Sequence, residues 1–149
     1  MATRLRLELG NIEGVIELAE QDAPRSTKLL DSMLPIEQTA RHAMESGREV
    51  FILLEPNLDF PEENQTIYQT VGDVLMYYKP SWFVQPEPGY FNELPVLSWI
   101  YEQDTAIMGA YAPLATNVVG TIVEGLDKLR VEAPRMRREG FGRMRVSCL

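Results

Sequence analysis

The amino-acid sequence predicts a mainly β domain, a closed or nearly closed β-barrel capped by two helices. Apolar and charged residues alternate with a period of two near both ends of the chain, as in half-buried strands. Further short apolar runs lie between one early and one late helical pattern, an order that indicates a barrel with helical caps. No repeat or linker divides the chain, so we expect a single domain over residues 1–149.

The first elements are a hairpin and a helix. Leucines alternate with charged residues over 4–9, and residues 12–18 continue this period after a glycine-asparagine turn. A helix is expected over 22–34, because Pro24 in its first turn loses no hydrogen bond and Pro35 stops it.

The next segment is open to two interpretations. Residues 36–46 fit one face of a short helix, but they also lie just before a clear strand at 48–54. We favour a second hairpin, in which residues 39–45 return through a turn at Ser46-Gly47.

The second half of the chain adds strands and one helix. The helix is expected over 126–133, and Pro134 should break or kink it. The expected strands are 71–78, 95–101, the β-branched run 118–123, and 143–148.

Two irregular loops separate these elements. Residues 56–64 form an acidic loop, and residues 80–94 show no period and contain several prolines. A loop of the second kind inside a compact domain is functional or mobile. Its aromatic cluster could fold back as a lid, but we favour an interface between copies, and hence a homo-oligomer. The cluster consists of Trp82, Phe83, Tyr90 and Phe91.

Several segments carry a family resemblance. Residues 22–27, which lead into the first helix, and residues 119–127, which lead into the second, resemble the two ends of cyclophilins. The middle of the chain is closer to an uncharacterised bacterial family of cyclophilin-like proteins. This resemblance covers nearly the whole chain and implies a cyclophilin-like barrel without an established activity. The family's recurring motifs resemble residues 42–47, 63–68, 72–77 and 117–125.

The chain departs from true cyclophilins at the site of their chemistry. Those enzymes carry a Phe-His-Arg run, whose arginine polarises the prolyl amide, and a Gln-Gly-Gly run; neither occurs here. The barrel can therefore be shared without prolyl isomerisation. A residual isomerase would need Arg41 or Arg48 to take the place of that arginine.

His42 is the only histidine of the chain and thus the only imidazole that could act as a general base. In the predicted hairpin register it lies opposite Phe51 and shares a face with Glu49, whose carboxylate would orient the ring. His42 is therefore the candidate catalytic acid/base and Glu49 its orienting group. The alternative is a partly buried histidine whose nitrogen atoms are satisfied by the backbone.

Four further residues complete the expected ligand-binding set with His42. Glu63 and Asn64 end the acidic loop, where they could bind a ligand or tie the loop to the barrel through backbone hydrogen bonds. Tyr77 and Tyr101 lie on strands, as parts of the core or as walls of a cleft that orient a polar ligand with their hydroxyls.

Composition excludes several classes of function. A formal net charge of −8 argues against nucleic acid and against an anionic membrane. One histidine and one cysteine cannot form a His/Cys metal site, and no phosphate-binding or dinucleotide motif occurs, so we expect no metal and no cofactor. The lone Cys148 and the lack of a signal segment favour the cytoplasm.

The combined expectation is a cytoplasmic protein that binds a small amide-like molecule or assists a metabolic enzyme. A degenerate peptidyl-prolyl isomerase and a structural subunit of a homo-oligomer are the alternatives. Whether the protein is an enzyme stays open at this point.

Overall fold

The computed structural model describes residues 3–83, 88–89 and 93–149. These residues form nine strands and two α-helices, with a short 3₁₀ turn at Ser81–Phe83. The helices are α1 (Pro24–Ser32) and α2 (Leu126–Glu139). The strands are β1 (Arg4–Leu9), β2 (Ile12–Leu18), β3 (Ile36–His42), β4 (Glu49–Leu53), β5 (Gln65–Thr66), β6 (Asp73–Pro80), β7 (Glu93–Ile100), β8 (Thr116–Glu124) and β9 (Gly142–Cys148).

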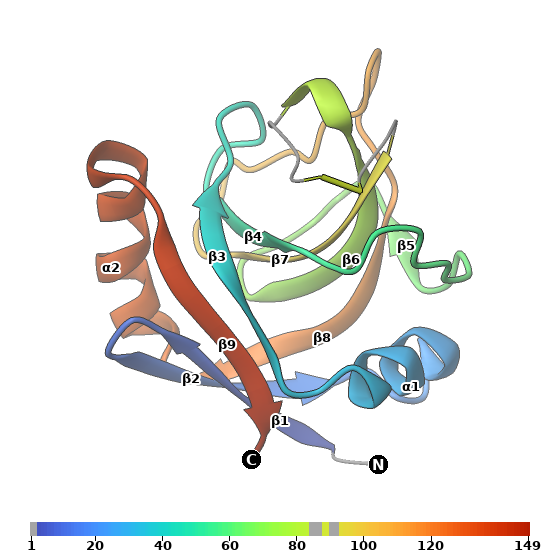
Figure 1. The fold of residues 1–149 in the computed structure, drawn as a ribbon, viewed down its shortest axis with the longest axis horizontal. Coiled ribbons are helices and arrows are strands. Elements are labelled where there is room, and N and C mark those ends of the chain that lie inside the picture. The colour runs from blue at the N-terminus through green and yellow to red at the C-terminus, as the bar shows by residue number, and fades with distance from the viewer. Residues whose placement is uncertain (1–2, 84–87, 90–92) are drawn as a thin grey trace.

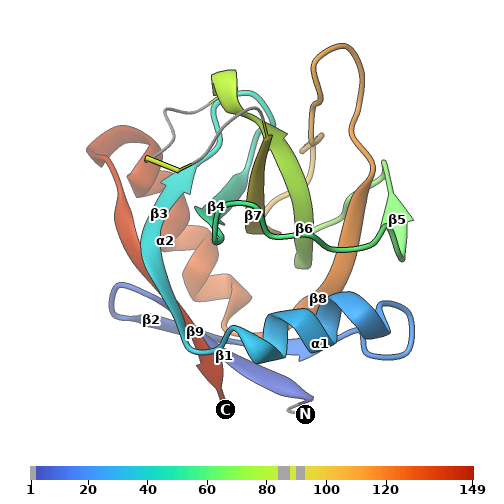
Figure 2. The same ribbon diagram turned by 45° about the vertical axis from the view of Figure 1, so that its right-hand side comes forward.

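Eight of these strands close into an antiparallel barrel (Figure 1). Their order is β2-β1-β9-β3-β4-β7-β6-β8, and β8 pairs with β2 to complete the ring. The two-residue β5 pairs with the beginning of β8. Because β1 pairs with β9, the two ends of the chain lie side by side (Figures 1 and 2). The predicted closed barrel with two helices is confirmed.

Alternate residues of the strands fill the barrel with apolar side chains. The leucines of β1 are buried there, as are Val50 and Ile52 of β4 and Trp99 of β7. Both helices contribute to this core, Leu30 from α1 and Leu129 from α2. Helix α1 packs against β8, and α2 packs against β2 and β3. The alternation in the sequence thus matches the two faces of the strands.

A second apolar layer covers the opposite face of β4, β6 and β7. It contains Phe51, Leu75 and Tyr77, and the segment between β7 and β8 covers it with Ile107 and Leu114. This part of the sheet is therefore buried on both faces, which explains why β4 is a continuous apolar run with every residue buried. The polar groups of the candidate site lie at the edge of this layer.

The second hairpin exists, but its predicted register is wrong. Arg41 pairs with Phe51 and His42 pairs with Val50, one residue away from the prediction. A shift of one residue turns every side chain to the other face of the sheet, so His42 and Glu49 lie on opposite faces.

Long-range contacts explain this register. The two strands are joined by residues 43–48 rather than by a two-residue turn. This loop is held from outside, because the backbone N–H of Arg48 donates to Oγ1 of Thr105 and that of Ala106 donates to the carbonyl of Ser46. Ser46 and Gly47 lie inside this longer loop and do not form a two-residue turn between the strands.

The predicted break of the second helix at Pro134 is also wrong. Helix α2 continues through this proline to Glu139. A proline inside a helix costs about 3 kcal/mol. Ala133 and Met136 are buried on either side of it, and this packing against the barrel offsets the cost.

The predicted aromatic interface falls largely on residues that are not described. Of the loop 80–94, residues 84–87 and 90–92 lie outside the described part of the chain. Trp82, which is described, is exposed. The role of this loop as an interface stays a prediction.

Candidate functional site at His42

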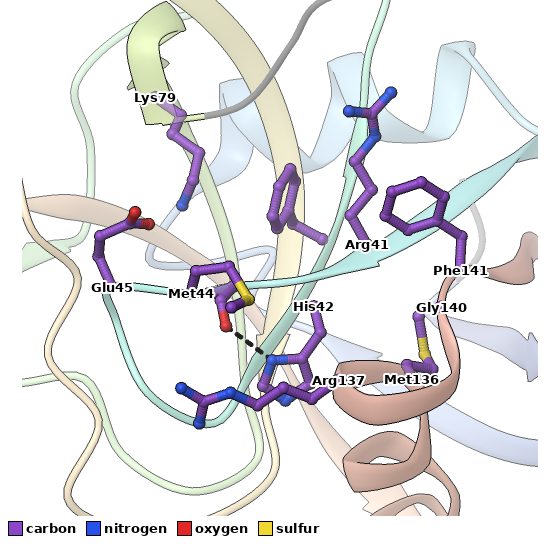
Figure 3. A pocket seen from close by; sticks show the side chains of 11 residues that line it. Arg41, His42, Met44, Glu45, Lys79, Met136, Arg137, Gly140 and Phe141 are labelled. Carbon is purple, nitrogen blue, oxygen red and sulfur yellow. Dashed lines mark hydrogen bonds between the residues drawn. The ribbon is translucent and has the colours of Figure 1, made fainter.

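A cavity of about 320 Å³ opens where the end of β3, the following loop and the end of α2 meet (Figure 3). Among the described residues, its walls contain three cationic side chains and one acidic side chain, Glu45. The apolar side chains come from separate segments of the chain. The cations are Arg41, Lys79 and Arg137, and the apolar side chains are Met44, Phe51, Met136 and Phe141.

His42 lines this cavity with both ring nitrogen atoms engaged. Nδ1 lies 2.7 Å from the carbonyl oxygen of Ala43, and Nε2 lies 2.6 Å from the hydroxyl of Tyr101. Because a carbonyl can only accept, Nδ1 carries the proton, and the Tyr101 hydroxyl donates to Nε2 of the neutral ring. The two rings meet edge to face, with centroids 5.7 Å apart. The imidazole is thus fixed in one tautomer and one orientation.

The surroundings of His42 favour its neutral form. Burial lowers the pKa of His42 from its usual 6.5, and the charges of Arg137 and Arg48 lower it further. The carbonyl of Ala43 and the charge of Glu49 oppose this shift. The neutral ring therefore adds no charge to the wall of the cavity.

Glu49, the predicted orienting group, does not hydrogen bond to His42. Its carboxylate is fully buried on the other face of the sheet, where Oε2 accepts a 2.6 Å hydrogen bond from the Tyr77 hydroxyl. The physical reason is the register of the hairpin, which points the two side chains in opposite directions. The hydroxyl of Tyr101 takes the place that the sequence predicted for this carboxylate.

The Glu49 carboxylate belongs instead to a buried polar cluster with Tyr77 and Lys79. Nζ of Lys79 lies 3.5 Å from Oε1 of Glu49 and donates to the Tyr77 hydroxyl at 3.3 Å. It also lies 4.6 Å from the centre of the Phe51 ring, a cation–π contact. Burial raises the pKa of Tyr77 well above its usual value, and the charge of Glu49 raises it further. Lys79 joins this cluster to the cavity, because it also lines the cavity wall.

Glu63 is placed at the N-terminus of α1. Its carboxylate accepts from the backbone N–H groups of Arg25 at 2.9 Å and Ser26 at 3.1 Å. The N-cap residue, Ala23, has no side chain that could do this. Glu63 therefore caps the helix from a distant loop, and its negative charge suits the positive end of the helix.

Asn64 fastens the same loop to the barrel. Its side-chain amide donates to the carbonyl of Val118 at 2.8 Å, and its own carbonyl accepts from the Val118 N–H at 3.1 Å. Neither Glu63 nor Asn64 is among the described residues that line the His42 cavity. Their hydrogen bonds are those of the alternative in which they tie the loop down. Their role in ligand binding stays a prediction.

The structure thus divides the predicted set into three places. His42 lines the cavity and binds Tyr101, which is not among the described lining residues, and Tyr77 binds Glu49 in the buried cluster. Glu63 lies at α1, and Asn64 binds Val118 on β8. Sequence reasoning missed three contributors. Arg137 and Lys79 line the cavity, and Asn117, which is almost fully buried, binds the acidic loop through the Pro61 carbonyl at 2.6 Å. Lys79 follows Tyr77 by two residues on one strand, which was the available signal for a shared face.

The described residues contain neither a candidate metal-binding cluster nor a candidate membrane-spanning helix. No group of three or more histidine, cysteine, aspartate or glutamate side chains in 3–83, 88–89 and 93–149 could hold a metal ion. Over the same ranges no helix has the length and apolarity needed to cross a membrane.

The closed antiparallel barrel and its two helices place the chain among proteins with a cyclophilin-like fold. More particularly, the chain belongs to the family described as "Protein of unknown function (DUF3830)", whose profile matches residues 5–148. No curated protein matches the chain.

Two solved structures share the fold. The structure of McbB in complex with tryptophan is similar with a TM-score of 0.70 and 19% identity, over 96% of this chain and 44% of McbB. This chain therefore spans less than half the length of McbB. The solution structure of the hypothetical protein AF2241 from Archaeoglobus fulgidus is similar with a TM-score of 0.55 and 25% identity, over 99% of this chain and 95% of AF2241.

Proposed function

We propose that this protein binds a small organic molecule in the His42 cavity, one that carries a carboxylate or amide oxygen on a partly apolar body. The observation that carries the proposal is the cavity of about 320 Å³ with three cations and four apolar side chains in its wall. This volume is at the lower end of the range for small-molecule sites, and a mostly apolar lining with a few polar groups is typical of them.

The charges at the cavity select the kind of ligand. The protein as a whole carries a formal net charge of −8, yet among the described lining residues Arg41 and Arg137 exceed the single acidic Glu45, while the charge of Lys79 is paired with Glu49. Arginine and lysine side chains only donate hydrogen bonds, so their partners are acceptor oxygens. A carboxylate satisfies the charge as well, and an amide oxygen satisfies the hydrogen bonds alone.

The apolar walls suit the remainder of such a molecule. Phe51 and Phe141 offer flat aromatic surfaces, and Met136 can adapt to an irregular shape. McbB, whose structure was determined in complex with tryptophan, supports this reading, because tryptophan combines a carboxylate with a planar apolar ring. A protein with such a site would serve as a binding or accessory protein in the metabolism of amides and amino-acid derivatives.

A binding screen tests the proposal. N-acetylphenylalanine carries both an amide and a carboxylate, and its methyl ester lacks the charge. A ligand at a hundred times its Kd stabilises the folded protein by about 2.7 kcal/mol, so the acid should raise the melting temperature clearly and the ester much less. Equal effects of acid and ester would contradict an anionic preference.

Two substitutions locate the ligand. Arg137→Gln should weaken the affinity for N-acetylphenylalanine about tenfold, since it removes one charge-assisted hydrogen bond. Arg138→Gln is the matched control, because Arg138 is the exposed next residue and is not among the described residues of the cavity. If the double variant Arg41→Gln/Arg137→Gln binds as tightly as the unchanged protein, the ligand does not occupy this cavity.

A degenerate prolyl isomerase is the second candidate, and one observation favours it. Arg41 lines the cavity, with its guanidinium 5.4 Å from the centre of the Phe141 ring, whereas Arg48 is exposed and is not among the described lining residues. Arg41 would therefore be the group that polarises a prolyl amide. NMR exchange measurements on a proline-containing peptide test this activity. An isomerisation rate equal to the uncatalysed rate excludes it.

A further inference from the structure

We propose that Lys79 forms an imine with a small α-keto acid that enters the His42 cavity. This inference rests on the proposed function, because it uses the same cavity and the same cations, and it adds a covalent step and a substrate class.

The position of Lys79 sets it apart from the other lysines. The chain has three, Lys28, Lys79 and Lys128, of which the first and third are exposed. Lys79 is only 1% exposed, yet it lines the cavity, and its side chain reaches into the wall near Glu45 (Figure 3). Burying a strongly hydrated ammonium is costly, so a lysine in such a place needs specific partners.

The partners of Lys79 can accept a proton from its ammonium group. Nζ of Lys79 donates to the Tyr77 hydroxyl at 3.3 Å, and that hydroxyl donates to Oε2 of Glu49 at 2.6 Å. The other carboxylate oxygen, Oε1, has no hydrogen-bond partner among the described residues and lies 3.5 Å from Nζ. Either directly or through the hydroxyl, one proton can pass from the ammonium to the carboxylate.

This transfer exchanges two buried charges for two neutral groups. Desolvation opposes an ion pair in an apolar environment, and the Phe51 ring and the second apolar layer form that environment here. The product is an uncharged amine at the wall of the cavity, which is the nucleophilic form of lysine. Glu49 and Tyr77 act as positioning and proton-holding residues behind it.

The covalent step balances without any further reagent. The lone pair of the neutral Nζ attacks the carbonyl carbon, the C–N bond forms, and the C=O π electrons move to oxygen, which takes a proton. The proton that the oxygen takes in this addition is one of the two protons of the attacking nitrogen. The carbinolamine then loses this oxygen as water, after a second proton has reached it from the protonated Glu49 through Tyr77. The remaining nitrogen proton returns to the Glu49 carboxylate. The net change is one carbonyl and one amine converted to one imine and one water, with no oxidation or reduction.

The other side chains of the cavity identify the substrate as an acid. Arg41 and Arg137 line the same cavity as Lys79 and match a carboxylate, for which the planar guanidinium has two parallel donors. An α-keto acid places such a carboxylate beside the reacting carbonyl. The apolar walls formed by Phe51 and Met136 suit a hydrocarbon side chain.

Reductive trapping tests the proposal on the unchanged full-length protein. Phenylpyruvate and sodium cyanoborohydride are added, and the modified lysine is identified by peptide mass spectrometry. The expected result is modification of Lys79 that saturates with phenylpyruvate concentration, while the exposed Lys28 and Lys128 serve as internal controls. Modification of all three lysines without saturation, or of none, would overturn the inference.

The proton path has its own test. Tyr77→Phe removes the bridging hydroxyl and should slow trapping about a hundredfold, the range of general acid–base contributions. Binding of the unreactive analogue phenyllactate should be unchanged in this variant, whereas a purely structural effect on the cavity would weaken it as well. A trapping rate equal to that of the unchanged protein would remove Tyr77 from the step and leave only the direct transfer between Lys79 and Glu49.

Binding of phenyllactate separates this inference from the proposed function. Phenyllactate has a hydroxyl in place of the reacting carbonyl and cannot form an imine. If calorimetry detects its binding and phenylpyruvate is not trapped, the cavity binds acids and the imine is excluded. If neither binding nor trapping is seen, both proposals fail. Saturable trapping at Lys79 supports both.

Discussion

The hydroxyl of Tyr101 lies 2.6 Å from Nε2 of His42. This hydrogen bond joins the last residue of β3 to the residue that follows β7. With Nδ1 held by the carbonyl of Ala43, the ring has one proton and two satisfied nitrogen atoms. Protonation would place a second proton on Nε2 and reverse this hydrogen bond, so that the Tyr101 hydroxyl accepts it. The lowered pKa of His42 therefore comes mainly from the burial of the ring.

The first prediction concerns pH. The pKa of His42 is lowered in the folded protein, mainly by burial, whereas the unfolded chain has the usual value of 6.5. Between these two values the unfolded chain binds more protons, so the free energy of unfolding increases with pH through this window and is fully gained above 6.5. It is lost as pH falls through the folded pKa.

The single histidine makes this measurement direct. Its imidazole signal in NMR should titrate below pH 6.5, and denaturant unfolding between the folded pKa and 6.5 should show the slope. His42→Gln is expected to remove the slope in this window, while the carboxylates, which titrate at lower pH, keep theirs. A titration midpoint at or above 6.5 would contradict the assigned hydrogen bonds.

The second prediction concerns the cap of α1. Glu63→Ala removes the acceptor of the Arg25 and Ser26 N–H groups and should lower the free energy of unfolding by about 1 kcal/mol, as for other N-terminal caps. Glu62→Ala is the matched control on the exposed neighbour. The denaturant midpoint measures both. If Glu63→Ala also abolishes the binding of N-acetylphenylalanine, Glu63 has the ligand-binding role predicted from the sequence.

The sequence predicts local features of the fold but not those that depend on long-range contacts. The alternation of Leu5, Leu7 and Leu9 predicted a half-buried strand correctly, because the two faces of a strand are a local property. The register of the second hairpin depends on a hydrogen bond accepted by Thr105 and one donated by Ala106, both far away in the chain, and no local turn signal contains them. A one-residue error then separates His42 from its predicted partner.

The buried cluster illustrates a second limit. In the sequence, Lys79 is a polar residue between a predicted strand and a proline-rich loop, so the sequence does not predict its burial. Its ionic partner Glu49 lies on β4, and β7 runs between that strand and β6. A buried lysine becomes understandable only when this distant carboxylate is known. The family motif around Tyr77 indicated the region but not the contact.

The third prediction concerns the closure of the barrel. A Cβ atom at Gly120 would lie 2.7 Å from the carbonyl oxygen of Glu17, where β8 pairs with β2. Gly120→Ala should therefore force the two strands apart and lower the free energy of unfolding by about 1–3 kcal/mol. Gly142→Ala is the control, because a Cβ there meets its nearest atoms at 3.6 Å, an ordinary contact. Equal denaturant midpoints for the two variants would contradict the close approach.

The fourth prediction concerns the buried ion pair. Lys79→Met leaves the Glu49 carboxylate buried without its cation and should cost about 3–5 kcal/mol of unfolding free energy. Adding Glu49→Gln to this variant removes the uncompensated charge, so the double variant should recover much of that loss. Denaturant unfolding of the two single variants and the double variant gives the coupling energy directly.

An exposed ion pair provides the comparison for this measurement. Arg143 and Glu37 lie 2.9 Å apart, closer than Lys79 and Glu49, but both are open to solvent. Water and salt screen such a pair, so Glu37→Gln should change stability far less than Lys79→Met despite the shorter distance. If Lys79→Met is as stable as the unchanged protein, the buried ion pair contributes nothing measurable to stability and the prediction is wrong.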